Sequence, residues 1–152
     1  MTRRSSDTTA PTVGADGLEV LERAHCMELL ANHRVGRVAV EVADDSPLVV
    51  PVNYLLDGEA IVFRTDMGAK VRALRQGPVS FQIDEIDPYH QTGWSVLVRG
   101  VAYEATGAEV AHLLVEPWAP GDKERWIRIV PATVTGRRIR LTGSPVDDRG
   151  YR

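Results

Sequence analysis

The chain has 152 residues, of which 43% are hydrophobic and 26% are charged, and its formal net charge is −3. This length suits one compact domain with a real core, and the apolar content excludes a fully disordered protein. The acidic balance gives no electrostatic reason for nonspecific binding to nucleic acid or to anionic membranes. We therefore expect no nucleic-acid partner and no membrane association.

The longest apolar run, Leu48 to Leu56, is interrupted by Asn53 and is far shorter than the ~20 residues of a membrane-spanning helix. The N-terminus has two arginines but no apolar segment behind them, which argues against a secretory signal peptide. Cys26 is the only cysteine, so its expected role is core packing, and a reducing compartment fits. These features predict a cytoplasmic protein.

Two polar segments are expected to flank the folded part of the chain. Residues 1–16 lack hydrophobic periodicity and predict a disordered leader, and residues 143–152 predict a flexible tail. A single domain is expected over 17–142.

The domain begins with an amphipathic helix over 20–32, because Val20, Ala24, Met27 and Ala31 recur on one helical face. Hydrophobicity then alternates with a period of two, which is typical of half-buried strands. The expected strands are, in order, 38–42, 48–56, 60–65, 79–86, 93–105 and 126–135. Further short helices are expected over 67–75 and 107–115.

Turn and strand-breaking residues support this order of elements. Asp57-Gly58 is a two-residue hairpin signal between the second and third strands. Pro51 predicts an edge or a bulge, because proline cannot donate to a strand ladder. Gly136-Arg137 is expected to end the last strand. Six strands, three short helices and short turns predict a mainly antiparallel β-barrel with helices outside it.

The junction between the third strand and the following helix has the ingredients of a phosphate cradle. Arg64 and Thr65 end the strand, and Lys70 lies in the first turns of the expected helix. Backbone N–H groups and the positive end of a helix dipole would add to these side chains. An ordinary strand-to-helix turn with solvated charges is the alternative.

Two further segments could complete a site for a flat ligand. Pro51, Val52 and Asn53 lie on the neighbouring hairpin strand, where the Asn53 amide needs partners from a ligand ring or from nearby backbone. Trp94 and Ser95 begin the fifth strand and could add a stacking surface and a hydroxyl, with core packing as the alternative for Trp94. The sequence contains no Gly-rich phosphate loop, no paired metal-ligand spacing and no Gly-x-Ser-x-Gly elbow.

Five segments together resemble the pyridoxamine 5′-phosphate oxidase-like flavoproteins, and among these the branch of nitroimidazole-resistance and actinobacterial flavin-binding proteins. The segments are Arg34–Val40, Val50–Tyr54, Phe63–Thr65 with Gly68 and Lys70, Gly93–Gly100, and Trp126–Ile129 with Thr135–Arg137. The resemblance implies a six-stranded antiparallel split β-barrel of the FMN-binding type, and a homodimer with FMN in a cleft between the subunits. By this resemblance Arg64, Thr65 and Lys70 would hold the flavin phosphate, Pro51, Val52 and Asn53 would run along the isoalloxazine, and Trp94 and Ser95 would close the site.

The resemblance departs from the true pyridoxamine phosphate oxidases. They carry an Arg-Lys pair where this chain has Ala69-Lys70, and their C-terminal segment has a His that the tail over 143–152 lacks, so vitamin B6 oxidation is not expected. We expect an FMN-dependent oxidoreductase that reduces a small planar acceptor on the flavin itself, with no catalytic side chain and no metal. Because relatives of similar sequence bind a deazaflavin coenzyme or heme, the alternatives are a deazaflavin-dependent reductase and a non-enzymatic flavin- or heme-binding store or sensor.

Overall fold

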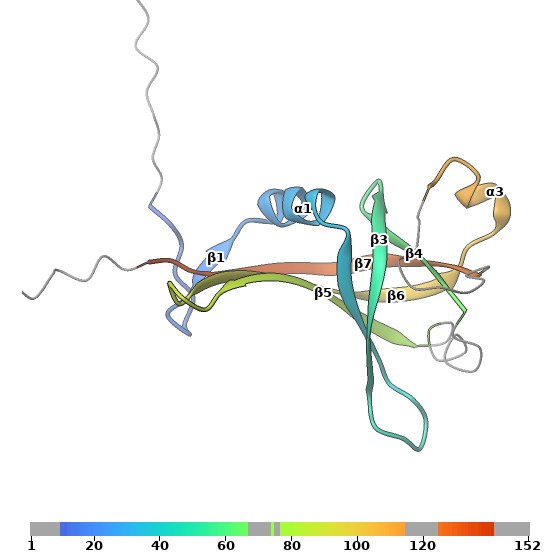
Figure 1. The fold of residues 1–152 in the computed structure, drawn as a ribbon, viewed down its shortest axis with the longest axis horizontal. Coiled ribbons are helices and arrows are strands. Elements are labelled where there is room, and N and C mark those ends of the chain that lie inside the picture. Colours follow the sequence, from blue (N-terminus) through green and yellow to red (C-terminus); the bar gives the residue numbers. More distant parts are fainter. Residues whose placement is uncertain (1–9, 67–73, 75–76, 115–124, 142–152) are drawn as a thin grey trace, which may run out of the picture.

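A computed structural model describes residues 10–66, 74, 77–114 and 125–141, and Figure 1 shows that strands dominate it. Its elements are β1 (Glu19–Leu21), α1 (Arg23–Asn32), β2 (Val35–Val40), β3 (Leu48–Asp57), β4 (Ala60–Thr65), β5 (Pro78–Asp87), β6 (Thr92–Glu104), α3 (Gly107–Val110) and β7 (Arg125–Ile139). The expected mainly β architecture is therefore confirmed.

Strands β2 to β7 close into a six-stranded antiparallel barrel. The hydrogen-bonded order is β7-β4-β3-β2-β5-β6, and β6 pairs back onto β7 to complete the ring. The short β1 lies outside this ring, where it pairs with residues 136–138 of β7. Helix α1 lies over one side of the long β5, β6 and β7 strands (Figure 1).

The barrel opens where β3 and β4 separate. These strands form the hairpin predicted by Asp57-Gly58, with Gly58 at a φ of 63°, but they pair only from Tyr54↔Phe63 to Asp57↔Ala60. Residues 48–53 of β3 pair with β2 instead, and Pro51 stands opposite Arg37. Pro51 therefore lies on the part of β3 that has no β4 partner, which confirms its expected edge position.

The alternating hydrophobic residues of the strands fill the barrel. Phe81 and Tyr54 meet edge to face at 4.8 Å between ring centroids, and both are at most 2% exposed. The β2 backbone passes close to Phe81, because a Cβ added at Gly36 would lie 2.2 Å from the Phe81 Cζ atom. Cys26 lies on the buried face of α1 and is fully buried, as expected for a core cysteine.

The largest corrections concern the two ends of the domain. The expected helix over 20–32 begins only at Arg23, because residues 19–21 form strand β1. Strand β7 does not stop at Thr135 but continues to Ile139. Gly136 is a close-approach position rather than a turn, since a Cβ there would lie 2.6 Å from the Cys26 Sγ atom.

Two smaller corrections concern element lengths. The first long strand begins at Val35 rather than 38, and the helix expected over 107–115 is the single turn Gly107–Val110. Thr106 caps this turn by accepting a hydrogen bond from the Glu109 backbone, while the Glu109 side chain accepts one from the Thr106 backbone. This reciprocal capping stabilises a turn that is too short to be stable alone.

Some expected elements lie outside the described residues. The helix over 67–75 is one of them, except that Leu74 is helical and fully buried, and the tail over 143–152 is another. Within the expected leader, the Val20 N–H donates to the Thr12 carbonyl at 2.7 Å, and Asp16 forms an ion pair with Arg137 at 3.0 Å. None of the described helices has the length and hydropathy needed to cross a membrane.

Candidate functional site

The first group of predicted site residues lies where β3 and β4 separate. Tyr54↔Phe63 is the ladder pair at the opening, and Asn53 immediately precedes Tyr54 while Arg64 immediately follows Phe63, so these two residues flank the opening between the strands. The Arg64 guanidinium lies 5.3 Å from the ring centroid of Trp126, its ladder partner on β7. Thr65 is 3% exposed at the end of β4. A cation and a hydroxyl are thus held beside a strand edge.

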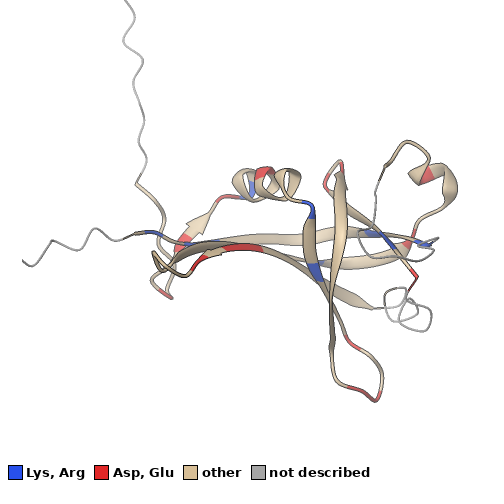
Figure 2. Ribbon diagram, viewed as in Figure 1, with Lys and Arg blue, Asp and Glu red and all other residues tan. Residues whose placement is uncertain are grey.

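Pro51 lines a hollow of about 420 Å³ at the C-terminal end of α1. Basic positions mark the α1–β2 connection and β2 beside it (Figure 2). Arg37 contacts Asp84 at 3.2 Å, which balances its charge. Arg34 donates to the carbonyls of Ala31 at 2.7 Å and His33 at 3.0 Å, which satisfies backbone groups at the helix end.

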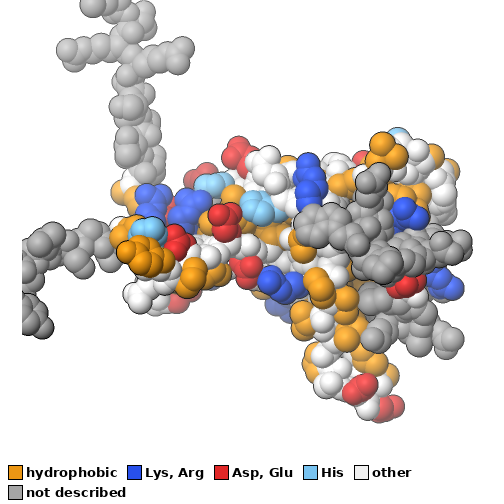
Figure 3. Space-filling model, in the orientation of Figure 1, with side chains coloured by type: hydrophobic (Ala, Val, Ile, Leu, Met, Phe, Trp, Pro, Cys, Tyr) orange, Lys and Arg blue, Asp and Glu red, His pale blue; other side chains and the backbone are white. Residues whose placement is uncertain are grey.

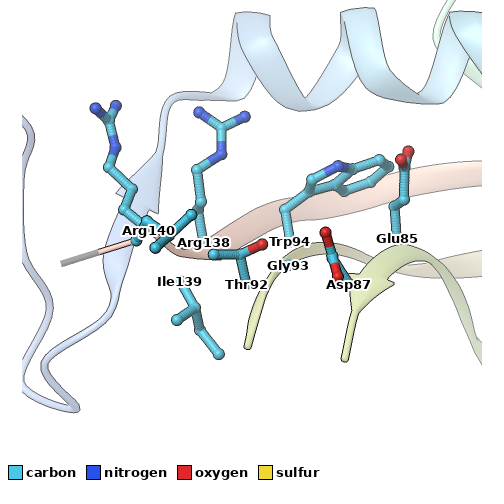
Figure 4. A pocket seen from close by; sticks show the side chains of 9 residues that line it. Glu85, Asp87, Thr92, Gly93, Trp94, Arg138, Ile139 and Arg140 are labelled. Carbon is cyan, nitrogen blue, oxygen red and sulfur yellow. The ribbon is translucent and has the colours of Figure 1, made fainter. Parts of the chain in front are cut away.

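Trp94 and Ser95 form a second group on β6, and their side chains point to opposite faces of the sheet. Trp94 lines a hollow of about 530 Å³ beneath α1, seen from close by in Figure 4. Ser95 stands opposite Asp84 on β5 and Arg137 on β7. The two residues therefore cannot contact the same side of one ligand within a single chain.

The structure does not bring the two groups together in one chain. In the barrel β3 and β6 are separated by β2 and β5 on one side and by β4 and β7 on the other. Neighbouring strands lie ~4.8 Å apart, so either path spans roughly 14 Å across the sheet. One group consists of Pro51, Val52, Asn53, Arg64 and Thr65, and the other consists of Trp94 and Ser95. Lys70 lies outside the described residues.

Sequence reasoning missed the residues around Trp94. The Trp94 ring meets His33, the residue that follows α1, edge to face at 4.8 Å, and Arg138 of β7 is its ladder partner. Arg138 donates from Nη2 to the His25 Nε2 atom at 3.3 Å. These neighbours come from segments far apart in the chain, and no spacing pattern in the sequence relates them.

A polar cluster beside the β3–β4 turn was missed for the same reason. Asp57 accepts hydrogen bonds from Arg128 and, at 3.2 Å, from His112. These bonds hold the pKa of Asp57 below its usual range, with the Arg128 bond as the larger cause. The contact of Arg128 with an acid makes it a structural residue of the hairpin.

Tyr54 connects the strand opening to helix α1. Its hydroxyl donates to the Leu30 carbonyl at 2.7 Å, and burial raises the pKa of this phenol, so it stays neutral. Over the described residues, no group of three or more His, Cys, Asp or Glu could hold a metal ion.

The chain is similar to a known protein family and to a mycobacterial protein. The family model for pyridoxamine 5′-phosphate oxidase matches residues 22–138. An uncharacterized protein of Mycobacterium tuberculosis is 38% identical over 128 residues, which cover 78% of this chain and 84% of that protein.

Solved structures share the fold. One is the FAD-binding protein of Mycobacterium smegmatis, which is 30% identical with a TM-score of 0.62 and matches 81% of this chain and 99% of that chain. Another is a protein of unknown function from Corynebacterium diphtheriae, which is 31% identical with a TM-score of 0.67 over 79% of this chain and 96% of that chain. The split-barrel fold and the resemblance are thereby confirmed, and the chain belongs to the pyridoxamine 5′-phosphate oxidase family.

Proposed function

We propose that the protein binds a flavin nucleotide, FMN, at the opening between β3 and β4, and that the reduced flavin passes electrons to a small planar acceptor. The separation of these strands beside Arg64 and Thr65 is the observation that carries this proposal. The Mycobacterium smegmatis relative, 30% identical, is described as FAD-binding, which supports a flavin here. When bound, the flavin supplies hydride or single-electron transfer, and the chain supplies binding and orientation.

The residues of the opening fit the two chemical parts of a flavin nucleotide. Arg64 and Thr65 would hold the phosphate by charge-assisted hydrogen bonds, with Lys70 as a further cation on the same segment. Pro51, Val52 and Asn53 would lie along the isoalloxazine, where the edge of β3 has no β4 neighbour. FMN ends at the phosphate that this cradle would bind. In FAD the same phosphate is followed by a second phosphate and adenosine.

A second copy of the chain is proposed to complete the cleft. Trp94 and Ser95 lie three strand positions from Pro51 in one chain, and this separation supports a dimer in which another copy brings them to the same ligand. Exposed apolar residues on the outer barrel surface suit such a contact. Val101 and Val130 are ladder partners that are 59% and 48% exposed, and hydrophobic side chains also gather along the β2–β3 hairpin (Figure 3).

The phosphate cradle is tested by titrating FMN and riboflavin into the wild type, Arg64→Ala and Arg23→Ala. Arg23 is an exposed arginine paired with Glu59 and serves as the matched control. Loss of a charged hydrogen bond, ~1.5–3 kcal/mol, should weaken FMN binding of Arg64→Ala roughly 10- to 150-fold. Riboflavin, which has no phosphate, should bind all three proteins equally. Unchanged FMN affinity in Arg64→Ala would place the phosphate elsewhere.

Four measurements test the rest of the proposal. The absorbance spectrum of the purified protein distinguishes flavin from a deazaflavin or heme, and light scattering should give twice 16.7 kDa. Anaerobic mixing of the reduced flavoprotein with quinones and nitroaromatics should reoxidise it faster than free reduced FMN. Reoxidation at the rate of free FMN would favour a store or sensor, and hydrogen peroxide release from pyridoxamine 5′-phosphate would contradict the expected absence of that activity.

A further inference from the structure

The hollow beneath α1 has the chemistry of a site for a flat anion. It has a volume of about 530 Å³, is lined by residues at the ends of β5, β6 and β7 and by Leu141, and lies on the side of these strands that faces α1 (Figure 4). We propose that it binds the planar acceptor as an aromatic carboxylate, with the ring against Trp94 and the carboxylate on Arg138. The acceptor role, though not the binding itself, rests on the proposed flavin function.

Trp94 is held as a rigid platform. Its ring meets His33 at an interplanar angle of 77°, and it remains partly exposed to the hollow. His33 is itself fixed, because its Nδ1 lies 2.7 Å from the Leu29 carbonyl and must donate to it. A ring that is already ordered loses little conformational entropy when a planar ligand stacks on it.

Arg138 lies directly beside this platform as the ladder partner of Trp94, and both side chains point toward α1 in Figure 4. Its only hydrogen-bond partner among the described side chains is His25. Because arginine cannot accept, His25 Nε2 must be the acceptor, so this bond orients the guanidinium without neutralising its charge. A ligand carboxylate could therefore pair with the remaining N–H groups.

The neighbouring Arg140 differs in this respect. It donates to Glu19 through Nε and, at 2.7 Å, through Nη2, so its charge is matched within the chain. Arg138 and Arg140 thus line the same hollow with the same kind of side chain. Arg138 is the ladder partner of Glu19 and its charge helps to lower the pKa of that carboxyl, but Glu19 accepts its hydrogen bonds from Arg140, so Arg138 has no direct acid contact among the described residues.

The acidic residues of the hollow give the bound ligand a direction. Glu85 and Asp87 lie on the other side of Trp94 from Arg138 in Figure 4. Asp87 is occupied by His90 at 2.6 Å, and Glu85 faces His33 at 3.6 Å. Their charge disfavours an anion at that end, so the carboxylate should lie at the Arg138 end and the uncharged part of the ring near the acids.

In the proposed dimer this position would place the acceptor beside the flavin. Trp94 of one copy would approach the flavin held by Arg64 of the other, so a ring stacked on Trp94 would lie next to the isoalloxazine. The hollow would then select anionic aromatic acceptors over neutral ones of the same shape.

The test compares 4-nitrobenzoate with the neutral 4-nitrobenzamide by calorimetry on the full chain, with and without FMN. The wild type should prefer the carboxylate roughly ten-fold, which is the fold-change expected for one partly exposed charged hydrogen bond. Arg138→Gln should abolish this preference without changing amide binding, whereas Arg140→Gln should change carboxylate affinity less than two-fold.

Several results would overturn the inference. Equal binding of acid and amide by the wild type would show that no carboxylate subsite exists. An equal loss of 4-nitrobenzoate affinity in Arg138→Gln and Arg140→Gln would show that the carboxylate responds to the general positive charge of the hollow instead of a specific contact with Arg138. Competition between FMN and 4-nitrobenzoate would show that the hollow is part of the FMN-binding site and not a separate acceptor site. Failure of FMN to bind would instead contradict the proposed function, while the acid-to-amide ratio would still report on the carboxylate site.

Discussion

Tyr54→Phe should destabilise the protein by loosening helix α1 from the barrel. The Tyr54 hydroxyl is the partner of the Leu30 carbonyl at 2.7 Å, one of the last four carbonyls of α1, which lack N–H partners within the helix. The substitution keeps the aromatic contact with Phe81 but leaves this buried carbonyl unsatisfied, at a cost of ~1–3 kcal/mol. At ~2–4 °C per kcal/mol for a chain of this size, the melting temperature should fall by roughly 2–12 °C.

Tyr103→Phe provides the matched control, because the Tyr103 hydroxyl donates to Glu109 at 3.3 Å on the exposed surface. Its loss should cost less than ~0.5 kcal/mol. Both variants are compared by urea unfolding and by hydrogen exchange of the α1 amides, which should speed up only in Tyr54→Phe. Equal unfolding free energies for the two variants would refute the view that a buried helix-end bond holds α1 in place.

Two further substitutions test the hairpin and the core. The pKa of Asp57 is lowered by its bonds to Arg128 and His112, so its contribution to stability is present above pH ~4 and is lost as the pH falls through the lowered pKa. Asp57→Asn should therefore melt at a lower temperature at pH 7, and its melting temperature should fall less steeply than that of the wild type as the pH drops below ~4, whereas an equally steep fall would contradict this role. Gly36→Ala should cost ~1–3 kcal/mol by overpacking against Phe81, and Phe81→Leu in the same chain should recover part of that loss in urea unfolding; no recovery would mean that the backbone of β2 resists the change.

Local patterns predicted the strands well because each strand buries one face. The alternation over 60–65 and the Asp57-Gly58 turn sufficed to place β4 and its hairpin. Strand β1 escaped prediction because its three residues are held by β7, which lies more than a hundred residues later in the chain. The prediction that Gly136 ends the last strand was wrong for a related reason, since a glycine is required there by the close approach of Cys26 and Leu21 rather than by a turn.

The candidate site shows the same limit. Arg64, Thr65 and Asn53 could be related from the sequence because a short hairpin joins their strands. The surroundings of Trp94 could not, because His25, Glu85 and Arg138 come from three separate elements that only the closed barrel brings near each other. The local hairpin can be read from composition and spacing, while the hollow depends on barrel closure.

The long β7 strand also determines when the barrel can form during synthesis. It pairs with β4 on one side and β6 on the other, including Ile129 with Ile61 and Gly136 with Val96. A nascent chain that has not yet released residues 125–139 from the ribosome would therefore hold an open sheet with β4 and β6 as exposed edges. Such edges can pair with other chains, so the interval before β7 emerges is the period when this protein most needs protection by a chaperone.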